Sequence, residues 1–84
     1  SRYPYKLLSL DSGGREVRGW LAGRPHIVDA NMFGSKYHIV TDDACGARRS
    51  VEAAFREHGG TPPGLRDIDP GLEDLFVAFA GKED

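Results

Sequence analysis

The sequence predicts an α+β fold in which two β-α-β units are joined by a β-hairpin and followed by one further helix. Three observations lead to this prediction. Alternating apolar and polar residues flank the dipeptide Gly34-Ser35, a pattern typical of a hairpin. Apolar residues recur at helical spacing in 15–22 and again between Asp42 and His58. Short strand-like runs precede the first helix and follow the second.

The first strand is expected over residues 5–10, where an apolar run begins with an aromatic residue and stops at the turn signal 11–14. The first helix is expected over 15–22. Its apolar residues Val17, Trp20 and Leu21 stand at positions i, i+3 and i+4, which share one helix face.

The hairpin is expected to pair residues 27–33 with residues 36–41. A two-residue turn that begins with glycine fits type II′ geometry. We expect the hairpin to supply the central pair of strands. The residues expected to face the helices are Val28, Ala30 and Met32, with Asp29 and Asn31 on the opposite side.

The second helix is expected to open at Asp42-Asp43, which read as a cap, and to run to about His58 before Gly59-Gly60 stops it. Its apolar stripe is Val51, Ala54, Phe55 and His58. His58 at the helix C-terminus would place partial positive charge where the helix dipole favours it. Arg48-Arg49 in an early turn read as a solvated pair.

A fourth strand is expected over 65–68, and a last helix begins at Asp69 with Pro70 in its first position. This helix ends at Gly81, and its apolar stripe is Leu72, Leu75, Phe76 and Phe79. The element order β-α-β-β-α-β matches a ferredoxin-like split βαβ sandwich, with the last helix as an addition.

Composition restricts the function classes. Eighty-four residues suit one domain, 1–84. The net charge of −2 argues against a nucleic-acid partner that depends on phosphate neutralisation. No apolar run is long enough for direct membrane insertion, and no signal peptide is expected at Ser1. The lone Cys45 excludes an internal disulfide and fits a reducing, cytosolic compartment.

No catalytic, cofactor-binding or metal-binding set is predicted from the residues. Ser12-Gly13-Gly14 matches the heart of an ATP-binding-cassette signature, but a turn is the simpler interpretation. The phosphate-binding loop G-x-x-x-x-G-K-[ST] does not occur. The three histidines lack metal-ligand spacing with one another and with Cys45, which reads as an ordinary thiol.

The segment 69–81 resembles the closing motif of many ABC-transporter ATPase subunits, a Pro-Ser-Leu-Glu-Asp-Val-Phe-like stretch that ends in Leu-Thr-Gly. The matching residues are Pro70, Leu72, Glu73, Asp74, Phe76 and Gly81. This chain has Gly71, Leu75 and Ala80 where the motif has Ser, Val and Thr. The order of elements over 5–81 is also similar to the small domain that follows the ATPase core in multidrug and antibiotic exporters.

The resemblance implies an accessory domain of a larger, cytoplasmic ATPase subunit that lies at the inner membrane through its transporter complex. Its implied partners are the ATPase core of the same chain, a permease subunit and a second ATPase subunit. ATP and magnesium would bind in the parent protein and not in this domain. Pro70, Leu72, Glu73, Asp74, Phe76 and Phe79 form the family motif and a possible interface.

Three other classes of protein are alternatives to this interpretation. A stand-alone ferredoxin-like regulatory module would bind a small ligand or a protein partner. RNA recognition is disfavoured because Phe33 and Tyr37 lack the accompanying basic-aromatic motif. An acylphosphatase-type enzyme would need Asn31 in a loop, whereas the pattern places it in a strand.

Overall fold

The computed structural model describes residues 5–12 and 14–68. The elements follow the predicted order: β1 (Lys6–Leu10), α1 (Glu16–Leu21), β2 (Asp29–Phe33), β3 (Lys36–Thr41), α2 (Ala44–Glu57) and β4 (Leu65–Ile68). The fold is therefore α+β, as the spacing of apolar residues predicts. The expected last helix lies outside the described residues.

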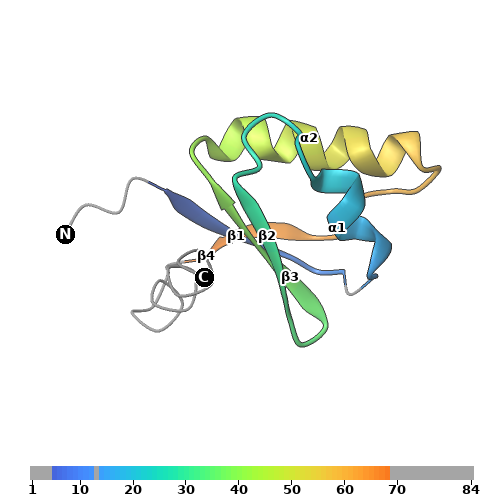
Figure 1. Ribbon diagram of the computed structural model, residues 1–84, viewed down its shortest axis with the longest axis horizontal. Coiled ribbons are helices and arrows are strands. Elements are labelled where there is room, and N and C mark those ends of the chain that lie inside the picture. The colour runs from blue at the N-terminus through green and yellow to red at the C-terminus, as the bar shows by residue number, and fades with distance from the viewer. Residues whose placement is uncertain (1–4, 13, 69–84) are drawn as a thin grey trace.

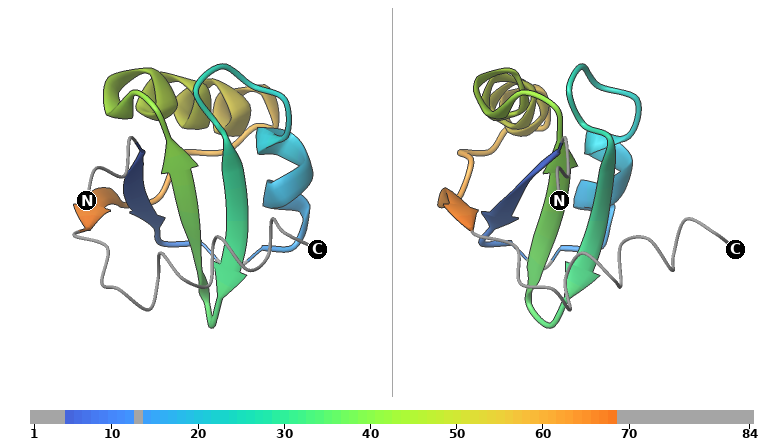
Figure 2. Two further views of the ribbon diagram at one scale, coloured as in Figure 1. Left: turned by 60° about the vertical axis from the view of Figure 1, so that its left-hand side comes forward. Right: turned by 90° about the vertical axis from the view of Figure 1, so that its left-hand side faces the viewer.

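The four strands form one antiparallel sheet in the order β2-β3-β1-β4, and α1 and α2 lie over the same face of it (Figures 1 and 2). The ferredoxin-like arrangement is thus confirmed. The type II′ turn of the predicted hairpin is also confirmed. This turn requires a positive φ at its first residue only, and φ is +64 at Gly34 and not positive at Ser35.

The prediction that the hairpin supplies the central pair of strands is wrong. The centre of the sheet is β1 with β3, and β2 is an edge strand. In a split βαβ unit the crossover through α1 carries β2 two positions away from β1, and β3 then enters the gap. Ala30 is buried on the helix-covered face, but Met32 and Val28 remain exposed at the edge.

The hydrophobic core lies between the sheet and the two helices. Its strand residues alternate, because successive side chains of a strand point to opposite faces. The core consists of Leu8, Leu10, Ala30, Tyr37, Ile39, Val17, Leu21, Ala47, Val51, Ala54 and Phe55. Trp20 closes the core between the helices: its ring meets Phe55 edge-on at 5.3 Å and stacks on His58 at 4.2 Å.

The start of α2 differs from the expectation that Asp42-Asp43 caps it. Asp43 is the N-cap residue but makes no side-chain cap hydrogen bond. Instead the Thr41 hydroxyl accepts from the Asp43 amide and donates to the Asp43 carbonyl, both at 2.9 Å. The predicted stop is confirmed: Gly59 has φ +80, and the Gly60 amide donates to the Phe55 carbonyl at 2.8 Å.

Arg48 is not part of a solvated pair, which corrects the sequence-based interpretation. Its guanidinium donates to the Leu65 carbonyl at 2.9 Å and lies 3.6 Å from the Asp67 carboxylate. Both partners belong to β4, so Arg48 fastens α2 to the short edge strand. Arg49, the next residue, is exposed.

An ion pair joins the loop after α1 to the end of α2. Arg24 donates to Glu57 at 2.5 and 3.4 Å, and this hydrogen bonding, followed by charge attraction, lowers the pKa of Glu57 below its usual 4.5. A carboxylate whose pKa is lower in the folded state than in the unfolded state stabilises the fold at any pH above its unfolded-state pKa. This contribution is lost as the pH falls through the folded-state pKa.

We therefore expect Glu57→Gln to make the acid-side loss of thermal stability shallower than in the unaltered chain, between about pH 5 and about pH 3. Melting temperatures across that range measure the effect. Glu52→Gln, at another exposed position of α2, is the matched control and should leave the slope unchanged. Equal slopes for the unaltered chain and Glu57→Gln would show that the pair makes no net contribution.

Candidate interface

The face of the sheet turned away from α1 and α2, here called the outer face, carries two cross-strand rows. The strand register places Asp29, Val40, Leu7 and Ile68 in the first row and Asn31, His38, Ser9 and Arg66 in the second. The first row is largely apolar and the second is polar. Both rows cross all four strands, because neighbouring residues are direct pairing partners.

The centre of the outer face is buried. Leu7 is 4 % exposed, Val40 3 % and Ser9 5 %, although none of them belongs to the core cluster under the helices. A side chain in the middle of an uncovered sheet face remains open to solvent from above. These low exposures therefore indicate that the outer face is covered. The helices of the described residues, 5–12 and 14–68, do not cover it, because α1 and α2 lie on the other side of the sheet (Figure 2).

The rim of the outer face is polar and partly open. Phe33 lies at the end of β2 and stacks on His38 with ring centroids 4.4 Å apart. Arg66 on β4 is exposed, and Lys36, paired with Phe33, is half-buried. The outer face therefore has an apolar centre that is buried within the chain and a polar, aromatic rim that is partly open to solvent.

The predicted interface residues follow the outer face directly in the chain. Ile68 ends β4 beside Leu7, and the next residue is Asp69. The residues of the family motif, Pro70, Leu72, Glu73, Asp74, Phe76 and Phe79, lie outside the described residues. At the predicted helical spacing, the apolar residues among them would share one helix face. Such a face could pack against an apolar sheet face.

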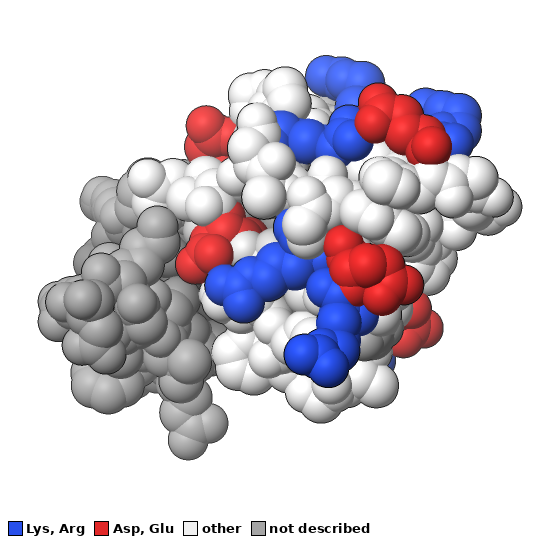
Figure 3. Space-filling view, turned by 45° about the vertical axis from the view of Figure 1, so that its right-hand side comes forward, with Lys and Arg blue, Asp and Glu red and all other residues white. Residues whose placement is uncertain are grey.

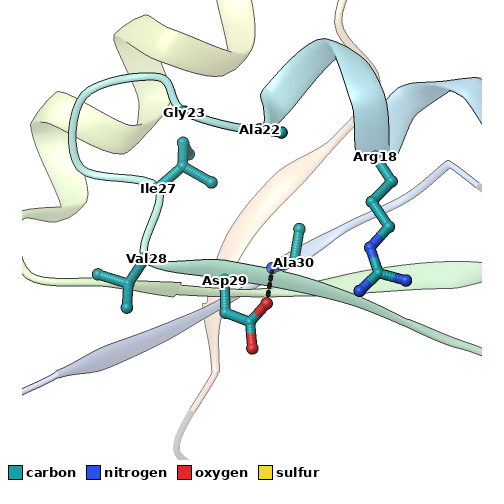
Figure 4. A pocket seen from close by; sticks show the side chains of 7 residues that line it. All are labelled: Arg18, Ala22, Gly23, Ile27, Val28, Asp29 and Ala30. Atoms are coloured by element: carbon teal, nitrogen blue, oxygen red, sulfur yellow. Dashed lines mark hydrogen bonds between the residues drawn. The ribbon is translucent and has the colours of Figure 1, made fainter. Parts of the chain in front are cut away.

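Hollows also lie on the helix side of the sheet. A cavity of about 260 Å³ opens between α1 and the edge strand β2, with Ile27 pointing into it (Figure 4). Asp29, at the border of this cavity, accepts from the Ala30 amide at 2.9 Å and from the Asn31 amide group at 3.3 Å. Asn31 thus lies on a strand, as predicted, and pairs with Asp29.

The second hollow, of about 340 Å³, lies between the loop after α1 and α2. His26 borders it in the left-handed backbone region, with φ +66. Its Nδ1 lies 2.8 Å from Asp42 Oδ1, and its Nε2 lies 3.8 Å from Asp43 Oδ2. Of the two aspartates expected to cap α2, Asp42 therefore lies within hydrogen-bond distance of the His26 ring, whereas Asp43 occupies the N-cap position.

The electrostatics of the surface are mixed. Lys and Arg side chains alternate with Asp and Glu over the visible surface in Figure 3. Cys45 is exposed in the first turn of α2. Among the described residues, no group of three or more His, Cys, Asp or Glu side chains could hold a metal ion, and no helix is long and apolar enough to cross a membrane.

Sequence reasoning missed the buried outer face, although a signal for it exists. Leu7-Leu8 and Ile39-Val40 are adjacent apolar pairs on the two central strands. Adjacent apolar residues on a strand point to opposite faces, so such pairs are typical of strands buried on both sides. The contact of His26 with Asp42 joins segments far apart in the chain and has no local signal.

No family model, no curated protein and no solved structure matches this chain.

Proposed function

We propose that this chain is the C-terminal accessory domain of an ABC-transporter ATP-binding subunit of the multidrug or antibiotic exporter type. The observation that carries the proposal is the motif from Pro70 to Gly81, which continues directly from β4. The order of elements over the described residues supports it, since a helix and a hairpin precede the motif in the domain that it resembles.

The proposed role is docking or regulation, with ATP hydrolysis assigned to a cassette outside this chain. The 84 residues contain no G-x-x-x-x-G-K-[ST] loop to hold a triphosphate. Docking would use the exposed surface of the described residues, because Leu7 and Val40 at the centre of the outer face are already buried within the chain.

The partners in this proposal are the ATPase core of the same polypeptide, a permease subunit and a second ATPase subunit. ATP and magnesium bind in the core. The whole subunit is cytoplasmic and is held at the inner membrane by the permease. The net charge of −2 and the mixed surface charge are compatible with protein partners and give no basis for a nucleic-acid partner.

A stand-alone ferredoxin-like regulatory module is the second candidate. The cavity of about 260 Å³ beside the edge strand β2 favours it, because a small ligand could bind there. Ile27 and Ala30 supply apolar lining and Arg18 supplies a cation. This candidate requires neither a cassette nor a permease.

Determining the coding sequence upstream of Ser1 tests the proposal. We expect the same reading frame to encode a G-x-x-x-x-G-K-[ST] loop and the remaining cassette motifs ahead of this chain. A reading frame that begins shortly before Ser1 without such a loop would contradict the transporter proposal and favour the stand-alone module.

A further inference from the structure

We propose that the outer face is the docking site of this chain's own last segment, residues 69–84, and is therefore not available to a second protein. This packing lies within one chain and requires neither a cassette nor a permease. The proposed occupant is this segment alone, and the experiment below distinguishes it from a second copy of the chain.

Few parts of the chain could cover the outer face. Leu7, Ser9 and Val40 are at most 5 % exposed, and α1 and α2 lie on the other side of the sheet. What remains of the chain is residues 1–4, residue 13 and residues 69–84. Four residues before Tyr5, or a single loop residue, are too few to cover a row of side chains that crosses several strands. The last segment is long enough.

The last segment begins beside the outer face and is long enough to cross it. The segment begins immediately after Ile68, which pairs with Leu7 in the apolar row of the outer face. Sixteen residues remain after Ile68. In helical form they would extend about 24 Å, whereas four paired strands are about 15 Å wide. The segment can therefore cross the whole sheet from the β4 edge.

The last segment and the outer face are chemically complementary. At helical spacing, Leu72, Leu75, Phe76 and Phe79 form one apolar stripe. This stripe matches the apolar row of Val40, Leu7 and Ile68. The segment also carries five acidic residues and one lysine. Lys36 and Arg66 lie at the rim of the outer face, so the charges of the two surfaces are opposite.

Nuclear magnetic resonance on the full 84-residue chain tests the contact. We expect nuclear Overhauser effects between the methyl groups of Leu7 and Val40 and the ring protons of Phe76 or Phe79. A sample that mixes isotope-labelled with unlabelled chains identifies the source. Contacts confined to single chains support the proposal. Contacts between labelled and unlabelled chains would assign the face to a second copy and overturn it, as would the absence of contacts.

A matched pair of substitutions gives an independent measurement. Phe76→Ala removes a ring from the apolar stripe, whereas Val77→Ala removes apolar atoms from the opposite side of the same segment. We expect Phe76→Ala to lower the melting temperature by more than about 10 °C and Val77→Ala by less than a few degrees. Equal, small shifts would overturn the proposal. If Phe76→Ala fails to fold, the contacts in the unaltered chain still decide.

Discussion

The substitution Tyr37→Ala is expected to leave the domain close to unfolding. Tyr37 is fully buried near the start of β3 and belongs to the core under both helices. Truncating a buried aromatic side chain costs about 3–5 kcal/mol, and small domains have a total stability of about 5–15 kcal/mol. Thermal or urea unfolding of the variant measures the loss.

Tyr37→Phe separates the hydroxyl from the ring. The Tyr37 hydroxyl donates to the Gly14 carbonyl at 2.7 Å, which fixes the loop that leads into α1. Removing the hydroxyl leaves a partly buried carbonyl without this donor, and we expect a loss of about 1–2 kcal/mol. A Phe variant as unstable as the Ala variant would contradict the assignment of most of the effect to the ring.

The second large effect is expected at Gly46 in α2, which faces the ring of His26 in the α1–β2 loop. A Cβ on Gly46 would lie 2.7 Å from Cγ and 2.9 Å from Nε2 of that ring, closer than such contacts allow. Gly46→Ala must therefore displace the ring from Asp42. Overpacking of this kind costs about 1–3 kcal/mol, and a urea titration measures it.

Two further variants test whether overlap with the His26 ring causes the loss of stability in Gly46→Ala. Gly19→Ala lies in the interior of α1, where an added Cβ meets nothing within 4 Å. We expect it to stabilise the domain by about 0.5–1 kcal/mol, because alanine favours helix.

His26→Gly removes the ring and suits the positive φ at that position. Gly46→Ala should therefore cost little in a His26→Gly background, and an undiminished cost would show that the ring is not its cause.

The sequence predicted the element types and most of the core because those depend on local spacing. Gly34-Ser35 identified the hairpin turn, and Val17 and Leu21 identified the buried side of α1. The strand order could not be deduced from the hairpin alone. Pairing of β1 with β3 joins segments about thirty residues apart, so no local pattern favours it over a central β2-β3 pair.

The candidate interface was less predictable than the fold. The stripe from Leu72 to Phe79 was identified from helical spacing, but its target surface depends on the register that aligns Val40 with Leu7 and Leu7 with Ile68. Similarly, the sequence pattern indicated that Arg48 is solvated and that Asp42 helps to cap α2. Their partners, Asp67 and His26, lie on distant segments that only the folded chain brings near.

Nucleotide binding measured on two proteins tests the central claim most directly. One is the complete product of the natural gene, and the other is this 84-residue chain. Calorimetric titration with magnesium-ATP should give saturable binding by the complete product and none by the chain, which has no phosphate-binding loop. Micromolar affinity of the chain itself, or no binding by the complete product, would contradict the assignment of this chain as the accessory domain of an ABC-transporter ATPase.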